Sequence, residues 1–333
     1  MNKIKLCITG GSGFIGTTAM VWALSKYDSI NFDIQPPKLL EHQHHWKFVD
    51  IREYESLKEA LFEFQPTHIL HLAAMTGMDI QEKSFFDANT KGVANLVRAA
   101  KEISSIKRIL FTSSLLVCQN GYVPSSDTEY DPPNLYGESK VIGEKMVRES
   151  QLKCDWLIVR PTSIWGPWFE HSYKKFFQVL DSGWYVHPGH QPIIKPLSYV
   201  GNTVHMMHKL LFHQGKEVSQ QTFYLADYHQ HSIQEWADLI SSEMGKNGKL
   251  KVFPVGVLRL LAKVGDVGKF FGWRDPPLTS FRLKNMLTGA KYPIKNTQMI
   301  VGDLPFNLQN GIRQTLDWMG QQGFLKHRIF DSA

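Results

Sequence analysis

A glycine-rich segment near the N-terminus constrains the fold of this chain more than any other feature. Residues 3–8 alternate and end in apolar residues, which predicts a buried strand, and a helical stretch follows at 17–26. Between the two, glycines recur at every third position in Gly10-Gly11-Ser12-Gly13-Phe14-Ile15-Gly16. In a strand–turn–helix unit of this kind, backbone N–H groups and the helix N-terminus hold a pyrophosphate. The segment therefore predicts a dinucleotide site formed by Gly10, Gly13, Phe14, Ile15 and Gly16.

An acidic residue closes the second predicted strand, at 30–34. Asp33 follows Gly16 by 17 residues, close to the roughly 20 at which a carboxylate binds a ribose hydroxyl. No arginine follows nearby to receive a 2′-phosphate, which favours NAD over NADP. Asp50 and Ile51 end a short third strand at 47–49, where they can border the adenine. A plain tight turn is the alternative for the glycine segment alone, and its surroundings argue against that alternative.

Strands and helices alternate through the first half of the chain. Further strands are predicted at 68–72, 108–112 and 156–159, and helices at 56–64, 88–103 and 136–150. This order predicts an α/β fold, a Rossmann-type doubly wound parallel sheet with helices on both faces. We expect residues 1–165 to form the NAD-binding domain. Residues 166–333 are expected to form mainly a smaller mixed α/β substrate domain, with some segments returning to the first. Helices are predicted there at 202–213, 232–245, 255–271 and 309–321.

Composition and charge exclude several classes of protein. With 43% hydrophobic and 20% charged residues, the 333-residue chain is typical of a globular protein. The net charge is +6, but no basic run indicates nucleic-acid binding, and a positive excess also suits anionic substrates. No apolar run reaches the roughly 18 residues of a membrane span. Three widely spaced cysteines indicate a reducing compartment, so we expect a cytoplasmic protein, and no residue spacing predicts a metal site.

A tyrosine and a lysine stand four positions apart in Tyr136-Gly137-Glu138-Ser139-Lys140, on one face of a predicted helix. An ammonium group near a phenol stabilises the phenolate, so we expect Lys140 to lower the pKa of Tyr136 from about 10. Such a tyrosine can act as a general acid or base. Upstream, residues 112–114 (Thr-Ser-Ser) end a strand and offer a hydroxyl for the substrate oxygen. These groups together predict a proton-transfer site.

The ordered set of motifs resembles the extended short-chain dehydrogenase/reductase family, in its nucleotide-sugar epimerase/dehydratase branch. The resemblance covers nearly the whole chain and is most specific over residues 1–165. The matching segments are Thr9 to Gly16, Asp50-Ile51-Arg52, His71-Leu72-Ala73-Ala74, Asn89-x-x-Gly92, Thr112-Ser113-Ser114, Tyr136 to Lys140 and Arg160-Pro161-Thr162. In the second half, residues 198–202 resemble the substrate-domain strand of that branch.

The resemblance implies a role for each matching residue. Tyr136 is implied as the acid/base, and Lys140 as its helper, which also holds the nicotinamide ribose of NAD. Ser114 is implied as the hydroxyl partner, with Ser113 as the second choice. Ala73, Asn89 and Thr162 are implied on the cofactor side, and Asn89 also supports the active site from its helix. Ser163 is implied on the sugar side, and Lys195 and Arg282 at a substrate diphosphate.

These roles predict an NAD-dependent hydride-transfer enzyme acting on a nucleotide-linked sugar, as a C4 epimerase or a keto-sugar reductase. Dehydratases of the branch carry acidic residues after the hydroxyl residue, whereas this chain has Leu115, Leu116 and Val117. The alternative is a dehydrogenase of a lipophilic alcohol such as a 3β-hydroxysteroid, which these apolar residues would also suit. A non-enzymatic NAD sensor is disfavoured, because a sensor needs no proton-transfer groups.

Two predicted helical regions bear on partners. In the resembling family, the helices at 88–103 and 136–150 pair into a four-helix bundle, so we expect a homodimer. Its candidate apolar positions are Val93, Leu96, Val97, Val141, Ile142 and Met146. The segment 255–271 is apolar at helical spacing with basic residues between. A core-packed amphipathic helix is favoured there, and a helix on a membrane surface is the alternative.

Overall fold

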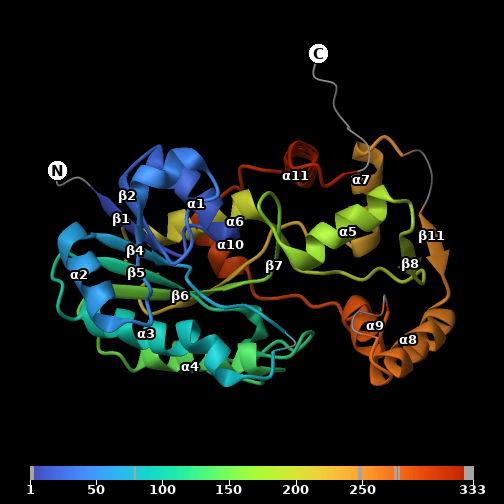
Figure 1. The fold of residues 1–333 in the computed structure, drawn as a ribbon, viewed down its shortest axis with the longest axis horizontal. Coiled ribbons are helices and arrows are strands. Elements are labelled where there is room, and N and C mark those ends of the chain that lie inside the picture. The colour runs from blue at the N-terminus through green and yellow to red at the C-terminus, as the bar shows by residue number, and fades with distance from the viewer. Residues whose placement is uncertain (1–3, 79, 247–249, 274–275, 277, 326–333) are drawn as a thin grey trace, which may run out of the picture.

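The computed structural model describes residues 4–78, 80–246, 250–273, 276 and 278–325. Seven parallel strands form one sheet in the order β10-β6-β5-β4-β1-β2-β3 (Figure 1). The strands are β1 (Lys5–Thr9), β2 (Asp28–Asp33), β3 (Trp46–Phe48), β4 (His68–His71), β5 (Arg108–Thr112), β6 (Asp155–Pro161) and β10 (Thr222–Leu225). The strand order reverses between β1 and β4, and sheets of this type bind ligands at such a switch point.

Strand β1 shows why the sheet is covered on both faces. Leu6 and Ile8 point to one face and Cys7 to the other, and all three are fully buried. Cys7 lies opposite Ile30 on β2 and Ile69 on β4, so an apolar row crosses the sheet. Strands that are apolar on both faces need helices on each side, because either face left bare would expose this row to water.

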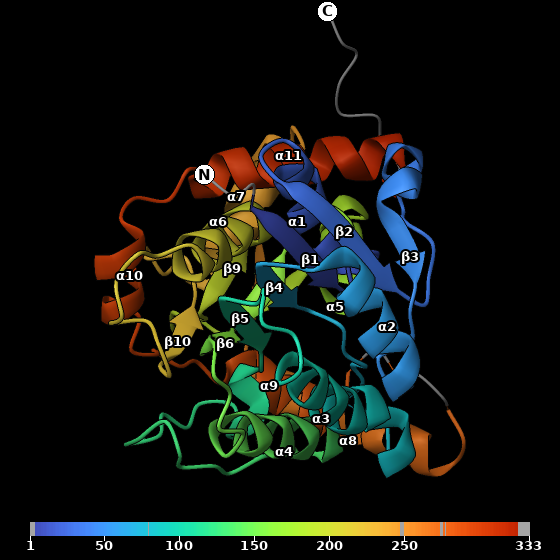
Figure 2. The same ribbon diagram turned by 90° about the vertical axis from the view of Figure 1, so that its left-hand side faces the viewer.

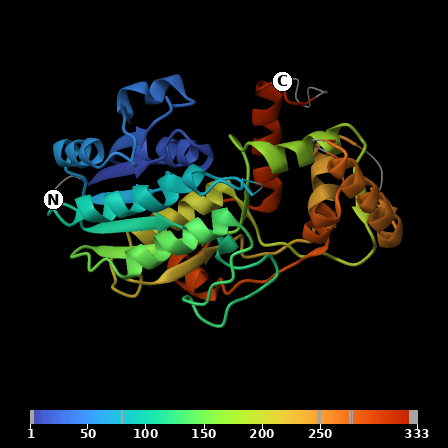
Figure 3. The ribbon, with the colours of Figure 1, turned by 60° about the horizontal axis from the view of Figure 1, so that its bottom comes forward.

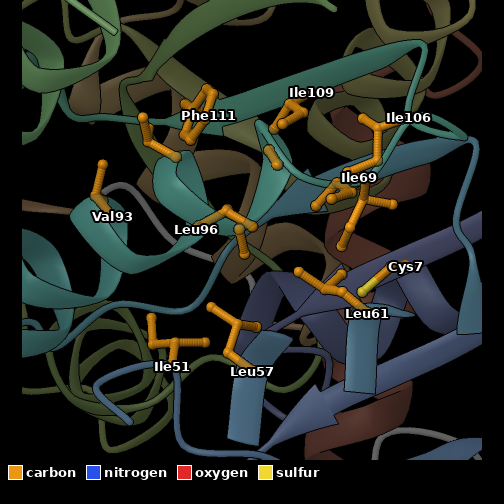
Figure 4. Close-up of a cluster of buried hydrophobic side chains, with 14 of the residues drawn as sticks. Cys7, Ile51, Leu57, Leu61, Ile69, Val93, Leu96, Ile106, Ile109 and Phe111 are labelled. Atoms are coloured by element: carbon orange, nitrogen blue, oxygen red, sulfur yellow. The ribbon is translucent and has the colours of Figure 1, made fainter. Parts of the chain in front are cut away.

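Helices form a layer on each face of the sheet (Figures 1 and 2). One layer contains α2 (Tyr54–Phe64), α3 (Asp87–Ala100) and α4 (Leu135–Arg148), and its core includes Leu57, Leu96 and Ile69 (Figure 4). The other contains α1 (Phe14–Leu24), α6 (Val200–Leu211) and α10 (Lys295–Val301), which pack on Leu6 and Ile8. The sequence-based prediction of a doubly wound parallel sheet is confirmed.

The rest of the described second half forms a smaller part beside the sheet (Figures 1 and 3). It contains β7 (Ser163–Trp165), α5 (His171–Asp181), β8 (Val186–Pro188), β9 (Leu197–Tyr199), α7 (Ile233–Glu243), β11 (Lys251–Phe253), α8 (Val255–Phe270), α9 (Ser280–Leu287) and α11 (Leu308–Gln321). Its aromatic core centres on Trp165 and Trp236, and Phe176 stacks on Trp236 at 4.8 Å between ring centroids. The chain passes several times between the sheet domain and this smaller part, because β10 belongs to the sheet and α6 and α10 pack on it.

Several predictions for the second half need correction. The segment 198–202, predicted as a strand, leaves the strand conformation after Tyr199, and α6 begins at Val200. The Asn202 side chain donates to Asp227 and to the Phe306 carbonyl, which fixes this first helical turn. The four-residue strand β10 has no counterpart among the predicted strands. The four predicted helices correspond to α6, α7, α8 and α11.

Candidate active site

The glycine turn joins β1 to α1 beside the end of β4. Gly10 has a φ of +76°, and a Cβ there would lie 2.6 Å from the backbone nitrogen of Ala73. A Cβ at Gly16 would lie 2.0 Å from the Gly10 carbonyl oxygen. Both positions therefore need glycine. The N-cap of α1 is Gly13, which has no side chain to cap the first helical turn. The N–H groups of that turn can therefore receive an anionic group such as a pyrophosphate.

Asp33 lies against this turn at the end of β2. Its Oδ2 accepts a hydrogen bond from the Ser12 N–H at 2.9 Å, and its Oδ1 accepts one from the Gln35 N–H at 2.9 Å. Burial raises the pKa of Asp33, and these N–H donors oppose that rise. The carboxylate is thus oriented toward the segment expected to hold the pyrophosphate, as a ribose-binding carboxylate must be.

We expect this carboxylate to determine the cofactor preference, because a carboxylate here would accept ribose hydroxyls and repel a 2′-phosphate. Replacing Asp33 by Ser together with Ile34, which is 38% exposed, by Arg should shift the preference from NAD toward NADP. Dissociation constants of both dinucleotides, measured by titration calorimetry, test this. The single variant Ile34→Gln is the control and should keep the preference for NAD. A wild-type chain that binds NADP more tightly than NAD would contradict the role of Asp33.

The other expected cofactor residues line the same edge of the sheet. Ala73 follows β4, and its N–H donates to the Thr9 hydroxyl at 3.3 Å. Thr162 follows β6, where its hydroxyl donates to the Leu225 carbonyl at 2.8 Å. Asn89 is buried on α3, where it bonds both backbone groups of Met75 and the Ser139 hydroxyl. Asn89 therefore joins the segment after β4 to α4, which is the supporting position that the resemblance implies.

Asp50 and Ile51, which follow β3, differ in their surroundings. Asp50 accepts hydrogen bonds from Arg52, and these bonds lower the pKa of Asp50. The Ile51 side chain is buried in the core against Gly92 of α3, where a Cβ would lie 2.5 Å from the Ile51 Cδ1 atom. Only the backbone of Ile51 is thus placed to border an adenine, and that contact stays a prediction.

Tyr136, Lys140 and Ser114 lie together where β5 ends and α4 begins. Asn134 caps α4 by accepting from the Gly137 N–H at 2.9 Å, which fixes the turn that carries Tyr136. A Cβ at residue 137 would lie 2.3 Å from the Leu116 carbonyl oxygen, so glycine allows α4 to approach the segment after Ser114. The side chains of Ser114 and Tyr136 lie close enough as a result that Ser114 lowers the pKa of the phenol.

A hydrogen bond to the end of β5 holds the Lys140 side chain in place. Lys140 is buried, its Nζ donates to the Thr112 carbonyl at 2.9 Å, and it lies 6.0 Å from the centroid of the Tyr136 ring. Burial raises the pKa of Tyr136, while the hydrogen bond with Ser114 lowers it. The expected lowering of this pKa is not found, because burial outweighs the contributions that lower it. At neutral pH the phenol is protonated and can donate.

Burial lowers the pKa of Lys140 to about 8 from an ordinary value of 10.5. Below pH 8 the lysine is protonated in both the folded and unfolded states. Between pH 8 and 10.5 only the unfolded state keeps the proton, so stability rises with pH in this window. Relative to Lys140→Met, the free energy of unfolding of the wild type should rise by on the order of 3 kcal/mol. Urea titrations across the window test this, and a constant difference would contradict it.

A buried ion pair lies one helical turn beyond Lys140. Glu144 accepts from the Arg160 Nε at 2.9 Å and from a terminal guanidinium nitrogen at 2.8 Å. It also accepts from the Ser113 hydroxyl at 2.6 Å and the Tyr130 hydroxyl at 3.1 Å. Ser113, the second choice for the substrate hydroxyl, is thus engaged with Glu144, which leaves Ser114 beside Tyr136. Sequence reasoning missed Glu144, although its spacing of four from Lys140 was a usable signal.

The expected substrate residues are more scattered. Ser163 begins β7 and bonds the Tyr173 side chain. Lys195 is half-buried, and burial lowers its pKa to about 8. Arg282 is half-buried on α9, and its guanidinium donates to the Pro276 carbonyl. A cavity of about 610 Å³ lies nearby, and its lining includes two cations that sequence reasoning missed, Arg259 and Lys291.

One edge of the parallel sheet carries the glycine turn, the Asp33 carboxylate and the side chains of Ser114, Tyr136 and Lys140. This combination defines an enzyme of the extended short-chain dehydrogenase/reductase type, with NAD as its cofactor. The family model described as "NAD dependent epimerase/dehydratase family" matches residues 6–184. The chain belongs to this family.

Relatives and solved structures agree with this assignment. The chain is 26% identical to an N-acetyl-alpha-D-glucosaminyl-diphospho-ditrans,octacis-undecaprenol 4-epimerase from Escherichia coli O157:H7, over 96% of each chain. It is 24% identical to a sterol-4-alpha-carboxylate 3-dehydrogenase from Schizosaccharomyces pombe, over 96% of this chain and 98% of the relative. Its fold matches a UDP-glucose 4-epimerase structure from Thermotoga maritima at 17% identity and a TM-score of 0.73, covering 96% of this chain and 99% of that chain.

Proposed function

We propose that this enzyme transfers a hydride to and from the sugar of a diphosphate-linked substrate, as a C4 epimerase or a keto-sugar reductase. The observation that carries the proposal is the placement of Ser114 and Tyr136 beside buried Lys140, at the edge of the sheet that bears the glycine turn. The relative of matching length named as a 4-epimerase supports the epimerase form.

Each residue has a distinct task in the proposed reaction. NAD, when bound, supplies the chemistry of accepting and returning a hydride. Ser114 holds the reacting sugar oxygen, and the Tyr136 phenol exchanges a proton with that oxygen through its hydrogen-bonded position. Lys140, anchored on the Thr112 carbonyl, holds the nicotinamide ribose and adds positive charge behind the phenol when protonated. Gly10, Gly13, Phe14, Ile15 and Gly16 receive the pyrophosphate, with Asp33 at the adenine ribose.

The residues after Ser114 disfavour the elimination of water from the substrate. Residues Leu115 to Val117 form a short 3-10 helix, and Leu115 packs in an apolar cluster with Tyr224 and Tyr292. A dehydratase needs an acid near the leaving hydroxyl, and these three positions offer none. The same cluster excludes water from one side of the reacting centre, which favours reversible hydride transfer.

A second candidate is the dehydrogenation of a lipophilic alcohol. It is favoured by the apolar cluster beside Ser114 and by the full-length match to a sterol dehydrogenase. The two candidates differ in whether NADH accumulates. The test incubates purified protein and NAD with UDP-glucose, N-acetylglucosaminyl-diphospho-undecaprenol or a 3β-hydroxysteroid. We expect a C4 epimer of a diphosphate-linked sugar without net NADH. If NADH forms only with the 3β-hydroxysteroid, the enzyme is a dehydrogenase of lipophilic alcohols and the sugar-diphosphate candidate fails.

A diphosphate substrate needs fixed cations. We expect Lys195→Gln, Arg282→Gln and Lys291→Gln each to raise KM for a sugar diphosphate by about tenfold, with kcat nearly unchanged, because each removes a charge-assisted hydrogen bond. Steady-state kinetics test this, with the exposed Lys91→Gln on α3 as control. Unchanged KM values in all three variants, together with good turnover of an uncharged alcohol, would exclude a diphosphate substrate.

A homodimer and a cytoplasmic location stay predictions. Of the apolar positions expected at a dimer contact, Val93, Leu96, Val97 and Val141 are buried within the chain. Met146 is half-buried in the same core, and Ile142 is 43% exposed. Since the sheet takes up most of these side chains, a dimer through α3 and α4 would need mainly polar contacts around Ile142. Light scattering at micromolar concentration tests the dimer.

A further inference from the structure

Helix α8 exposes an apolar face at the outer end of the molecule, away from the sheet (Figures 1 and 3, in orange). Phe270 is 86% exposed, Leu260 66% and Val264 59%. Single exposed apolar residues are normal on protein surfaces, but a contiguous set marks an interaction site. The further exposed apolar residues of this set, here named the α8 face, are Val257, Leu261, Val267, Phe271 and Trp273.

The helix is packed on its opposite side. Its buried residues are Leu258, Ala262 and Gly265, which meet α9 and the Leu278 segment. At about 100° per residue, Leu260, Val264 and Val267 project roughly opposite this packed stripe. The helix therefore has two apolar sides, of which the fold uses one. This corrects the expectation of a core-packed amphipathic helix, because the core covers only the narrower side.

Basic residues lie beside one edge of the α8 face. Arg259 and Lys263 are exposed along that edge with Asp266 next to them, whereas the exposed Lys269 projects toward the packed side. The Asp266 carboxylate accepts from the Ser280 N–H at 3.0 Å, on the side where α9 packs. Apolar residues along one side of a helix and lysines beside them are the pattern of helices that lie in an anionic membrane interface. A helix of 16 residues cannot span a bilayer, and no helix among the described residues is long and apolar enough to do so.

Helix α8 also borders a cavity near the proposed substrate site, through residues outside the α8 face. The cavity of about 610 Å³ is lined by Val255 and Arg259 of α8 and by the segment 289–291. Ala290 of that segment packs against the cluster of Leu115 and Tyr292, which directly follows Ser114. A substrate with its sugar at Ser114 and its diphosphate in this cavity would thus direct its remaining part toward α8.

We propose that α8 docks on an anionic lipid bilayer and presents the cavity to a lipid-linked sugar diphosphate. The docking step depends only on the exposed α8 face and the basic residues beside it, whereas the substrate step rests on the proposed function. Both full-length relatives described above are named for lipophilic substrates, a polyprenol and a sterol, which supports a lipid surface over a protein partner. A second copy of this chain is the competing occupant.

The experiment measures co-sedimentation of the full chain with vesicles of phosphatidylcholine containing roughly one third phosphatidylglycerol. We expect binding that weakens with salt, and a loss of at least tenfold in Leu260→Gln/Val264→Gln/Val267→Gln. The matched control is Val21→Gln/Phe62→Gln/Met299→Gln, three exposed apolar residues of the sheet domain, which should bind as the wild type does. Lys263→Gln should weaken binding about fivefold on anionic vesicles. Circular dichroism melting confirms that each variant is folded.

Activity separates the two steps. The α8-face variant should keep wild-type turnover of a soluble sugar diphosphate and lose turnover of the vesicle-borne polyprenyl form. Vesicle binding without any sugar turnover would support docking and overturn the proposed function. Equal vesicle binding by the α8-face variant and the wild type would overturn docking. Concentration-dependent dimers that vanish in the α8-face variant, without vesicle binding, would assign the face to a second copy of the chain.

Discussion

Replacing Tyr136 by Phe should lower turnover by roughly 10²–10⁴-fold and leave NAD affinity nearly unchanged. The phenol lies beside Ser114, where a substrate oxygen would exchange its proton. Phenylalanine keeps the ring, which packs near Phe86 at 6.1 Å between centroids, so the surrounding structure should persist. Single-turnover kinetics on the accepted sugar substrate and calorimetric titration with NAD measure the two effects separately.

Tyr54→Phe is the matched control for this substitution. Tyr54 lies on α2, where its hydroxyl donates to Glu102, remote from the glycine turn and from Ser114. Its loss should leave turnover unchanged, since no reacting group contacts it. If Tyr136→Phe turns over at nearly the wild-type rate, the proton is exchanged by another group and the assignment of Tyr136 is refuted.

Local spacing explains why the cofactor half of the site could be predicted from sequence. The glycine turn and Asp33 belong to one strand–helix–strand unit, β1 to β2, and the Tyr136–Lys140 pair belongs to one helical turn. Their geometry is set by the backbone of that unit, so the pattern alone places them. The end of β5 brings Ser114 to the same edge because parallel strands all point one way.

Groups that meet through tertiary packing could not be predicted in the same way. Glu144 and Arg160 are 16 residues apart on α4 and β6, and their contact depends on α4 crossing the end of β6. The cations of the cavity, Arg259 and Lys291, come from α8 and from the segment after α9. Helical periodicity over 255–271 identifies the helix, but only the elements packed around it decide which apolar side stays exposed.

The buried Glu144–Arg160 pair gives the largest stability effect that we expect. Arg160 is fully buried, and it also donates to the Tyr224 hydroxyl at 2.8 Å and to the Asp127 carbonyl at 2.6 Å. Burial disfavours the charged guanidinium, but the hydrogen bonds and charge of Glu144 outweigh it and raise the pKa of Arg160. Removing Glu144 would leave the buried charge of Arg160 without its counterion, whereas removing Arg160 would leave Glu144 with the more distant Arg148, at 3.6 Å.

Arg160→Met should therefore lower the free energy of unfolding by about 3–5 kcal/mol, as breaking buried ion pairs does. The double variant Glu144→Leu/Arg160→Met should recover part of this loss, because neither buried charge remains. Urea unfolding of both single variants and the double variant gives the coupling energy directly. Lys47→Met, which breaks an exposed pair with Glu63, should leave the unfolding midpoint nearly unchanged. If Arg160→Met destabilises no more than Lys47→Met, Glu144 is stabilised by Ser113, Tyr130 and Arg148 without the Arg160 guanidinium, and the expected contribution of the buried pair is refuted.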